Sequence, residues 1–138
     1  MDSAFVDTSG WVEFFVESAP FHEIAVFQMD LWQAEGRRVL TTNYVLTELT
    51  ALLHARRYVS RPQRARIIDT IRSAAWVEVV HITPELDEAA WNLLKARPDK
   101  DWSLVDCASF VVMEANKMRH ALTTDHHFAQ AGFDRLLA

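Results

Sequence analysis

The sequence predicts an α/β fold of three layers, α/β/α, around a central and mostly parallel sheet of four to five strands. Short apolar runs alternate along the chain with longer segments whose apolar residues follow helical spacing. Two of these runs, near opposite ends of the chain, stop at an aspartate that is followed by a helix start. Alternation of this kind is typical of a parallel sheet covered by helices.

The first strand and the first helix are expected close to the start of the chain. Ala4 to Val6 is a short apolar run that suits a buried strand. Thr8 or Ser9 can cap the helix that follows, because their hydroxyl oxygens accept hydrogen bonds from backbone N–H groups. We expect this helix to cover residues 11–17.

A glycine separates the second helix from the second strand. The helix is expected over residues 23–34, and Gly36 suits the left-handed conformation that commonly ends a helix. Residues 38–42 are typical of a strand. Asn43 can cap the next helix, in which the apolar positions again follow helical spacing.

Serine, threonine and proline mark the starts of the later helices. Ser60 and Gln63 form a capping-box pattern for a helix that runs to about residue 75. Thr83 followed by Pro84 starts a helix to about residue 96. Strands are expected at 76–82 and 121–124 and a further helix at 103–118, while 133–137 is either a last short strand or a tail.

The 138 residues, about half of them apolar, suit one globular domain over residues 1–138. The first residues lack the pattern of a signal peptide, and no apolar stretch is long enough to span a bilayer. The lone Cys107 cannot form a disulfide within the chain. We therefore expect a cytoplasmic protein with no membrane partner.

Three aspartates are candidate site residues, although each has a simpler explanation. Asp7 and Asp125 follow strands, and a parallel sheet gathers such strand ends at the edge where ligands bind. Either aspartate alone is equally well explained as a turn or capping residue. Asp106 fits a capping box with Ser103, and taken alone it is better explained as a cap than as a ligand.

Glu48 is harder to explain by packing. It lies on or beside the apolar stripe of its helix, next to Leu49 and one turn before Leu52. A carboxylate in such a place needs a partner to offset its desolvation. That partner is either a structural one, such as an arginine, or a ligand.

Together, the four acids predict a metal site. Asp7, Glu48, Asp106 and Asp125 would all face the same crevice, where their charges would repel unless a cation neutralised them. Oxygen ligands favour Mg²⁺ or Mn²⁺. Asp101, one turn before Asp106, is a candidate fifth ligand or a solvated loop acid.

Hydroxyl groups and histidines flank these acids. Thr8, Ser9, Thr123 and Thr124 could donate hydrogen bonds to the carboxylates of the metal site. His126 and His127 could assist a reaction or contact phosphate, or could simply cap a helix or lie on the surface. The sequence contains no zinc-binding pattern of histidines and cysteines.

The charge of the chain gives two opposing indications about nucleic acid as a binding partner. A net charge of −5 argues weakly against such a partner. A local basic run between residues 56 and 72 offsets that argument. Our candidates for RNA binding are Arg56, Arg57, Arg61 and Arg64.

At these positions the chain resembles the PIN domain family. The resemblance spans essentially the whole chain, and the order and spacing of the acids fit throughout. Residues 101–107 and 122–128 resemble in particular the toxins of VapBC toxin–antitoxin pairs. The matching segments are Phe5-Val6-Asp7-Thr8-Ser9 followed by Trp11, Asp101-Trp102-Ser103-Leu104-Val105-Asp106-Cys107, and Leu122-Thr123-Thr124-Asp125-His126-His127-Phe128.

This resemblance implies a PIN-like fold and a Mg²⁺- or Mn²⁺-dependent endoribonuclease, the toxin of a type II pair. Asp7, Glu48, Asp106 and Asp125 match the acidic tetrad of the family, and Asp101 matches an extra acid of some members. It also implies an RNA substrate, a homodimer, and a small antitoxin whose C-terminal segment occupies the site.

Two other functions remain open from the sequence. One is a Mg²⁺-dependent phosphotransfer domain in which an aspartate such as Asp7 becomes phosphorylated. Against it, Thr8-Ser9-Gly10 follows Asp7, without a second aspartate two positions on. The other is a catalytically inactive PIN-like binding module. All four acidic positions are filled, and this argues against an inactive module.

Overall fold

Five parallel strands form a single sheet in a computed structural model that describes residues 3–56 and 59–138. The strand order is β3-β2-β1-β4-β5, and each neighbouring pair is parallel. This confirms the expected α/β sheet and makes the last segment its fifth strand. The strands are β1 (Ala4–Val6), β2 (Val39–Thr42), β3 (Val77–Val80), β4 (His120–Leu122) and β5 (Asp134–Arg135).

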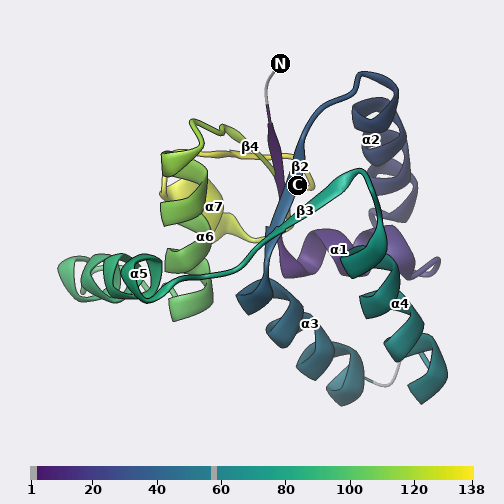
Figure 1. The fold of residues 1–138 in the computed structure, drawn as a ribbon, viewed down its shortest axis with the longest axis horizontal. Helices are drawn as coiled ribbons and strands as arrows, with labels where there is room; N and C mark the ends of the chain where they lie inside the picture. The colour runs from purple at the N-terminus through teal and green to yellow at the C-terminus, as the bar shows by residue number, and fades with distance from the viewer. Residues whose placement is uncertain (1–2, 57–58) are drawn as a thin grey trace.

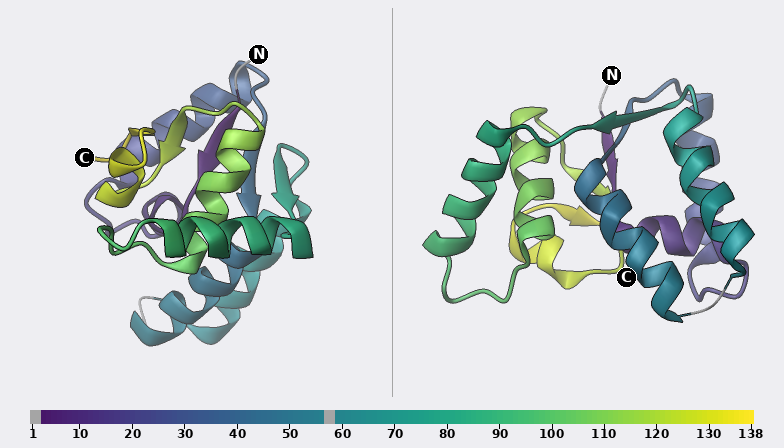
Figure 2. Two further views of the ribbon diagram at one scale, coloured as in Figure 1. Left: turned by 90° about the vertical axis from the view of Figure 1, so that its left-hand side faces the viewer. Right: turned by 60° about the horizontal axis from the view of Figure 1, so that its bottom comes forward.

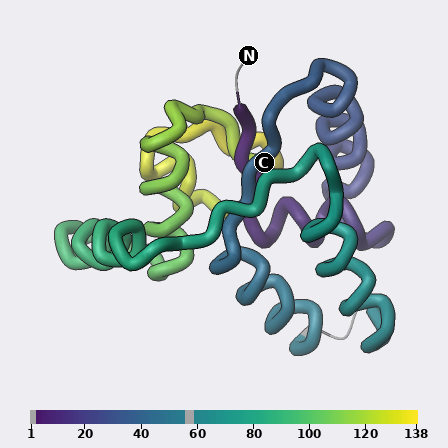
Figure 3. Tube along the Cα trace, viewed as in Figure 1, coloured from purple at the N-terminus to yellow at the C-terminus, as the bar shows by residue number. Residues whose placement is uncertain are grey.

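Helices cover both faces of this sheet and complete the three layers. In Figures 1 and 2, α1, α2 and α4 lie on one side of the strands and α5, α6 and α7 on the other. The trace in Figure 3 shows α3 beyond the end of β2, where the parallel strands finish. The helices are α1 (Thr8–Phe15), α2 (His22–Ala34), α3 (Asn43–Arg56), α4 (Arg61–Ser73), α5 (Pro84–Ala96), α6 (Leu104–Ala115) and α7 (His126–Gln130).

The central strands are buried on both faces, as their continuous apolar sequences require. All of β1 and the last two residues of β4 are inaccessible to solvent. Trp11 of α1 and Phe128 of α7 lie among the largest fully buried side chains. The hydrophobic core therefore fixes both strand ends that precede the acids.

Gly10 allows α1 to lie directly against the end of β4. A Cβ atom at Gly10 would stand 2.0 Å from the carbonyl oxygen of Leu122, a distance that no side chain tolerates. The backbone N–H of Asp7 also donates to this carbonyl, at 3.2 Å. The first turn of α1 and the residues after β4 are therefore held close together.

The start of α1 differs from the sequence expectation. The helix begins at Thr8, and Asp7 is its N-cap, so the prediction that Thr8 or Ser9 caps it is wrong. The Asp7 carbonyl accepts from Trp11 N–H at 3.1 Å, while the Asp7 side chain makes no capping hydrogen bond. Both hydroxyl residues thereby lie inside the first turn and face the strand ends.

Asn43 also has a different role from the predicted one. Thr42 caps α3, because its hydroxyl accepts from Val45 N–H at 3.0 Å. The Asn43 side chain instead accepts from Ile82 N–H, at 2.8 Å, and ties α3 to the segment after β3. The capping roles predicted for Ser60, Thr83 and Ser103 are confirmed.

Helix α6 and strand β4 are shorter than expected. Helix α6 ends at Ala115 because the chain turns through Lys117, whose φ is 55°. Strand β4 ends at Leu122, two residues earlier than predicted. Asp125 therefore does not end a strand but caps α7.

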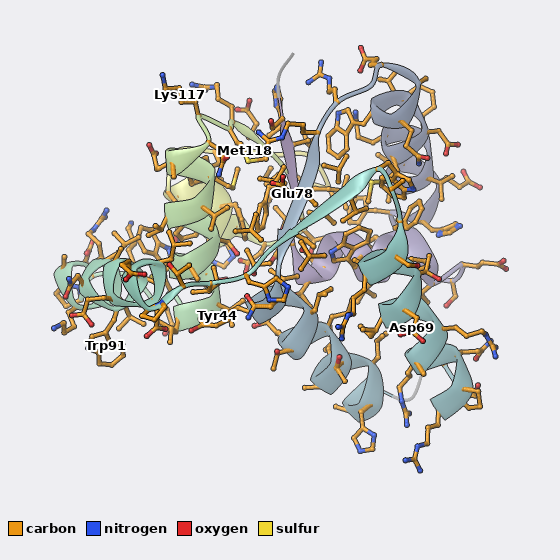
Figure 4. The ribbon with its side chains drawn as sticks, viewed as in Figure 1. Tyr44, Asp69, Glu78, Trp91, Lys117 and Met118 are labelled. Carbon is orange, nitrogen blue, oxygen red and sulfur yellow. The ribbon has the colours of Figure 1, made fainter. Side chains whose placement is uncertain are left out.

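Helix α5 extends away from the strands and packs on α6 (Figure 1). Tyr44, at the start of α3, donates a 2.6 Å hydrogen bond to Asp87 of α5. Figure 4 shows Tyr44 near this junction and Trp91 on the outer part of α5, where it is exposed.

Candidate metal centre and active site

Asp7 lies at the end of β1, buried beneath the neighbouring elements. Its Oδ2 accepts a 3.0 Å hydrogen bond from the Thr123 hydroxyl, whereas its Oδ1 is buried with no partner among the described residues. The pKa of Asp7 is raised to about 7, chiefly by burial and to a smaller extent by the charges of Asp106 and Glu48, while hydrogen bonds from the Thr8 backbone and the Thr123 side chain act against this rise. A buried oxygen left in this state is a candidate ligand for a cation.

Hydroxyl groups fix the orientation of Asp7. Thr123 has one proton to donate and gives it to Asp7, so the 3.0 Å contact between the Ser9 and Thr123 hydroxyls has Ser9 as its donor. Ser9 in turn accepts from Thr124 N–H at 2.9 Å, and Thr123 accepts from Asp125 N–H at 3.0 Å. The result is a relay that runs from Ser9 through Thr123 to Asp7.

Glu48 faces Asp7 from α3 and is partly buried. Its Oε1 accepts a 2.5 Å hydrogen bond from the Thr8 hydroxyl, so its partner is a threonine and not the arginine that the sequence left open. Burial raises the pKa of Glu48, and the nearby charges of Asp106 and Asp125 raise it further. These effects of charge show that Glu48 lies near the other three acids of the prediction.

Asp106 is at once a helix cap and a member of this cluster. Its Oδ2 accepts from Ser103 N–H at 3.0 Å, and Ser103 Oγ accepts from Asp106 N–H at 3.0 Å. The same Oδ2 lies 2.9 Å from Nδ1 of His127. Burial raises the pKa of Asp106, with a contribution from Asp125 and an opposing one from His127.

Asp125 enters the cluster from the N-cap of α7. Its Oδ1 accepts from His127 N–H at 2.9 Å and lies 3.3 Å from the His127 ring. Because carboxylates only accept, the Nδ1 of His127 carries the proton that it shares with Asp106 and Asp125. His127 thus orients two acids, a role that the sequence left open and that only its position two residues after Asp125 hinted at.

His126 is exposed, yet its ring lies near the same acid. Three ligand atoms lie within 4.8 Å of one another, one each from Asp125, His126 and His127. Imidazole is a ligand that Mn²⁺ tolerates better than Mg²⁺. The cluster therefore presents carboxylate oxygens inside and imidazole nitrogens at its rim.

Two further candidates stand apart from these contacts. Asp101 is exposed on the connection before α6, and no hydrogen bond within residues 3–56 and 59–138 joins it to the cluster. In the same ranges, Thr124 contributes backbone groups: its N–H donates to Ser9 and its carbonyl accepts from Arg135 at 3.2 Å. Its hydroxyl is not seen to reach a carboxylate.

The residues of this cluster fit a divalent cation. The charges of the four carboxyl groups act on one another, three of these groups have a raised pKa, and one buried oxygen of Asp7 has no donor in the described chain. A cation would relieve the repulsion and supply the missing partner. Oxygen ligands of this kind suit Mg²⁺ or Mn²⁺.

The basic run lies along a groove between α3 and α4. This groove, of about 720 Å³, is lined by Arg61 and Arg64 of α4 and by His54 of α3. Arg56 is the last residue of α3, and Arg57 lies outside the described residues. Helix α3 also carries Glu48, although Glu48 is not among the residues that line the groove.

None of the helices in the described ranges is long and apolar enough to cross a membrane.

The model of the family called PIN domain matches residues 4–134 of the chain. The chain is 34% identical, over 129 residues, to the 23S rRNA-specific endonuclease VapC20 of Mycobacterium tuberculosis, in strain CDC 1551 / Oshkosh and in strain H37Rv. The alignment covers 94% of this chain and 94% of the relative.

Two solved structures resemble the fold. The crystal structure of Mycobacterium tuberculosis VapC20, described as a sarcin–ricin loop cleaving toxin, matches with a TM-score of 0.82 at 33% identity, over 96% of this chain and 97% of that one. PAE2754 from Pyrobaculum aerophilum matches with a TM-score of 0.62 at 16% identity, over 98% of this chain and 90% of that one, a similarity of fold alone.

Proposed function

Because the chain belongs to the PIN domain family, we propose that it is a divalent-metal-dependent endoribonuclease and the toxin of a type II toxin–antitoxin pair. The observation that carries the catalytic part is the buried Oδ1 of Asp7, which has no partner in the described chain although the charges of Glu48 and Asp106 act on this carboxyl group. The similarity to VapC20 over nearly the whole chain supports the toxin assignment.

In this proposal Asp7, Glu48, Asp106 and Asp125 hold Mg²⁺ or Mn²⁺, and Asp101 is the candidate fifth ligand. The bound ion supplies positive charge that stabilises the phosphate as negative charge develops on it. The protein contributes fixed ligands, because the Ser9–Thr123 relay holds Asp7 and the Thr8 hydroxyl holds Glu48.

Charged hydrogen bonds hold the remaining two acids. His127 donates to Asp106 and Asp125 and keeps both turned toward the cluster. His127 is therefore a positioning residue for two of the proposed metal ligands.

The RNA phosphates are proposed to follow the groove between α3 and α4. Arg61, Arg64 and His54 line it, and arginine suits phosphate because its planar guanidinium donates two parallel hydrogen bonds. Arg56 and Arg57 extend the same run in the sequence. Binding through such contacts weakens as salt concentration rises.

The partners of the chain are proposed from its relatives. VapC20 is a 23S rRNA-specific endonuclease, which makes 23S ribosomal RNA the first substrate to test. We further propose a cytoplasmic protein that forms a homodimer and is held inactive by a small cognate antitoxin.

The proposal is tested by incubating the purified chain with 23S ribosomal RNA in Mg²⁺, in Mn²⁺ and in EDTA. We expect cleavage at defined positions with either ion and none in EDTA. Cleavage that continues in EDTA would overturn the metal-dependent mechanism. Failure to cleave any RNA, together with intact binding of Mg²⁺ and RNA, would favour the inactive binding module.

A further inference from the structure

A cavity of about 230 Å³ lies beside the acidic cluster, between α1, the α1–α2 connection and α3. Leu52 lines it from α3, one helical turn after Glu48, and Thr124 lines it from the segment after β4. The face that α1 turns toward it, at spacing i, i+3, i+4 and i+7, consists of Ser9, Val12, Glu13 and Val16.

The cavity and the acidic cluster share a wall. Ser9 lines the cavity and accepts from Thr124 N–H at 2.9 Å, and it donates to the hydroxyl of Thr123. That hydroxyl in turn donates to Asp7. A group in the cavity therefore lies two hydrogen bonds away from the proposed metal ligand.

Glu13 is an unusual residue to find in this cavity. Its side chain is only 7% exposed, and its Oε2 accepts a long hydrogen bond, 3.3 Å, from the backbone N–H of Phe21. In the described part of the chain no basic side chain forms a salt bridge with it. A carboxylate only accepts hydrogen bonds, and the one from Phe21 N–H leaves this side chain with capacity to accept further donors.

On the premise of the proposed ribonuclease function, we propose that this cavity binds a guanine base of the RNA beside the cleaved phosphate, and that Glu13 accepts the N1–H and N2–H donors of that base. Guanine is the RNA base that presents two adjacent donors to one carboxylate. Adenine and cytosine each place a ring nitrogen acceptor beside their amino group, and that acceptor would face the Glu13 oxygens.

The lining of the cavity suits a nucleobase. Apolar walls from Val12, Val16 and Leu52 suit the flat faces of a ring. Ribonucleases that read unpaired RNA commonly splay a base out of its stack into such a pocket.

The experiment measures binding of GMP, IMP and AMP to the full chain in Mg²⁺, followed by NMR of the Val12, Val16 and Leu52 methyl groups. IMP lacks only the 2-amino group of GMP, and all three nucleotides carry the same phosphate. We expect GMP to bind about tenfold or more tightly than IMP and AMP, because a hydrogen bond to a charged group is lost.

Glu13→Gln separates recognition from structure. Its amide oxygen still accepts from Phe21 N–H, but its NH₂ group opposes the guanine donors, so we expect the preference for GMP to disappear. Glu23→Gln, at an exposed acid of α2, is the matched control and should keep the wild-type preference. If Glu13 only tethers α2, both variants would keep the wild-type preference for GMP over IMP and AMP.

Three results would overturn the inference: equal affinities for the three nucleotides, shifts that avoid the cavity methyl groups, or a response of those methyl groups to N-acetyl-arginine amide alone. The last would assign the cavity to a protein partner. Cleavage of RNA without any guanine preference would overturn this inference alone. Absence of RNA cleavage in the wild-type protein would overturn the proposed function, whatever the nucleotides do.

Discussion

Thr123 donates a hydrogen bond of 3.0 Å to Asp7 across 116 positions of sequence, inside a buried site. The same hydroxyl accepts from Ser9 and from Asp125 N–H, so all of its hydrogen-bonding capacity is used. One side chain thus links the strand end that bears Asp7 to the helix start that bears Asp125.

Replacing Thr123 with valine should weaken metal binding and cleavage together. The hydrogen bond stabilises the charged form of Asp7, and its loss, worth about 1.5–3 kcal/mol, should raise the pKa of Asp7 further. We expect Mg²⁺ affinity, measured by calorimetry at pH 7, to fall about tenfold or more. Thr123→Ser keeps the hydroxyl and should stay near wild type; equal loss in both variants would show that packing is responsible.

Asp7→Asn should abolish cleavage without unfolding the protein. The amide fits the same space but carries no charge for a cation, and it removes a buried carboxylate that is costly to ionise. Rates on 23S ribosomal RNA and circular dichroism spectra check the two halves of the prediction. Asp30→Asn, at an exposed position of α2, is the control. Wild-type rates for Asp7→Asn would refute the assignment of the site.

Without metal, the protein should lose stability as the pH rises from about 4 to about 7. The unfolded chain releases the Asp7 proton near the ordinary pKa of 3.8, while the folded protein keeps it up to a pKa of about 7. The folded state therefore loses its advantage across this interval, and the raised pKa values of Glu48 and Asp106 act in the same direction.

Thermal unfolding in EDTA between pH 5 and pH 8 measures this slope. Asp7→Asn should flatten the curve, and added Mg²⁺ should raise the Tm most at the alkaline end, where the ligands are ionised. A Tm in EDTA that rises with pH over this interval would contradict the burial of an ionisable Asp7.

Neutralising Arg61 or Arg64 should weaken RNA binding and reduce its dependence on salt. Each arginine that contacts a phosphate contributes about 0.7 to the slope of log K against log salt concentration for single-stranded RNA. We expect the slope for Arg61→Gln and Arg64→Gln to fall by about that amount, measured by fluorescence anisotropy. Arg119→Gln, exposed at the opposite edge of the sheet before β4, should leave the slope unchanged.

Features set by neighbouring residues could be predicted from the sequence, and features set by distant ones could not. The capping boxes of Ser60 and Ser103 were predictable because their partners lie three residues away. The partner of Glu48 was not, since Thr8 lies forty positions earlier and meets it only when α1 and α3 pack together. From its spacing alone, Asp106 was predicted to be either a helix cap or a metal ligand. A carboxylate has two oxygens and can have both roles at once.

The end of β4 shows the same limit. Thr123 and Thr124 suit a strand by propensity, but the ladder with β1 ends at Leu122 because its partner Val6 is the last residue of β1. The expectation that acids gather at one edge does not depend on this error, since it rests on the parallel order of the strands and not on the last residue of each.

The central place of β1 has a consequence for the order of events during synthesis. This strand pairs with β2 early in the chain and with β4 only near its end. Until β4 and the residues after it have left the ribosome, Asp7 lacks Thr123, Glu48 lacks Asp125, and one edge of β1 stays open. We therefore expect an unfinished chain to lack nuclease activity. The proposed nuclease can cleave RNA only after nearly all of it has been translated.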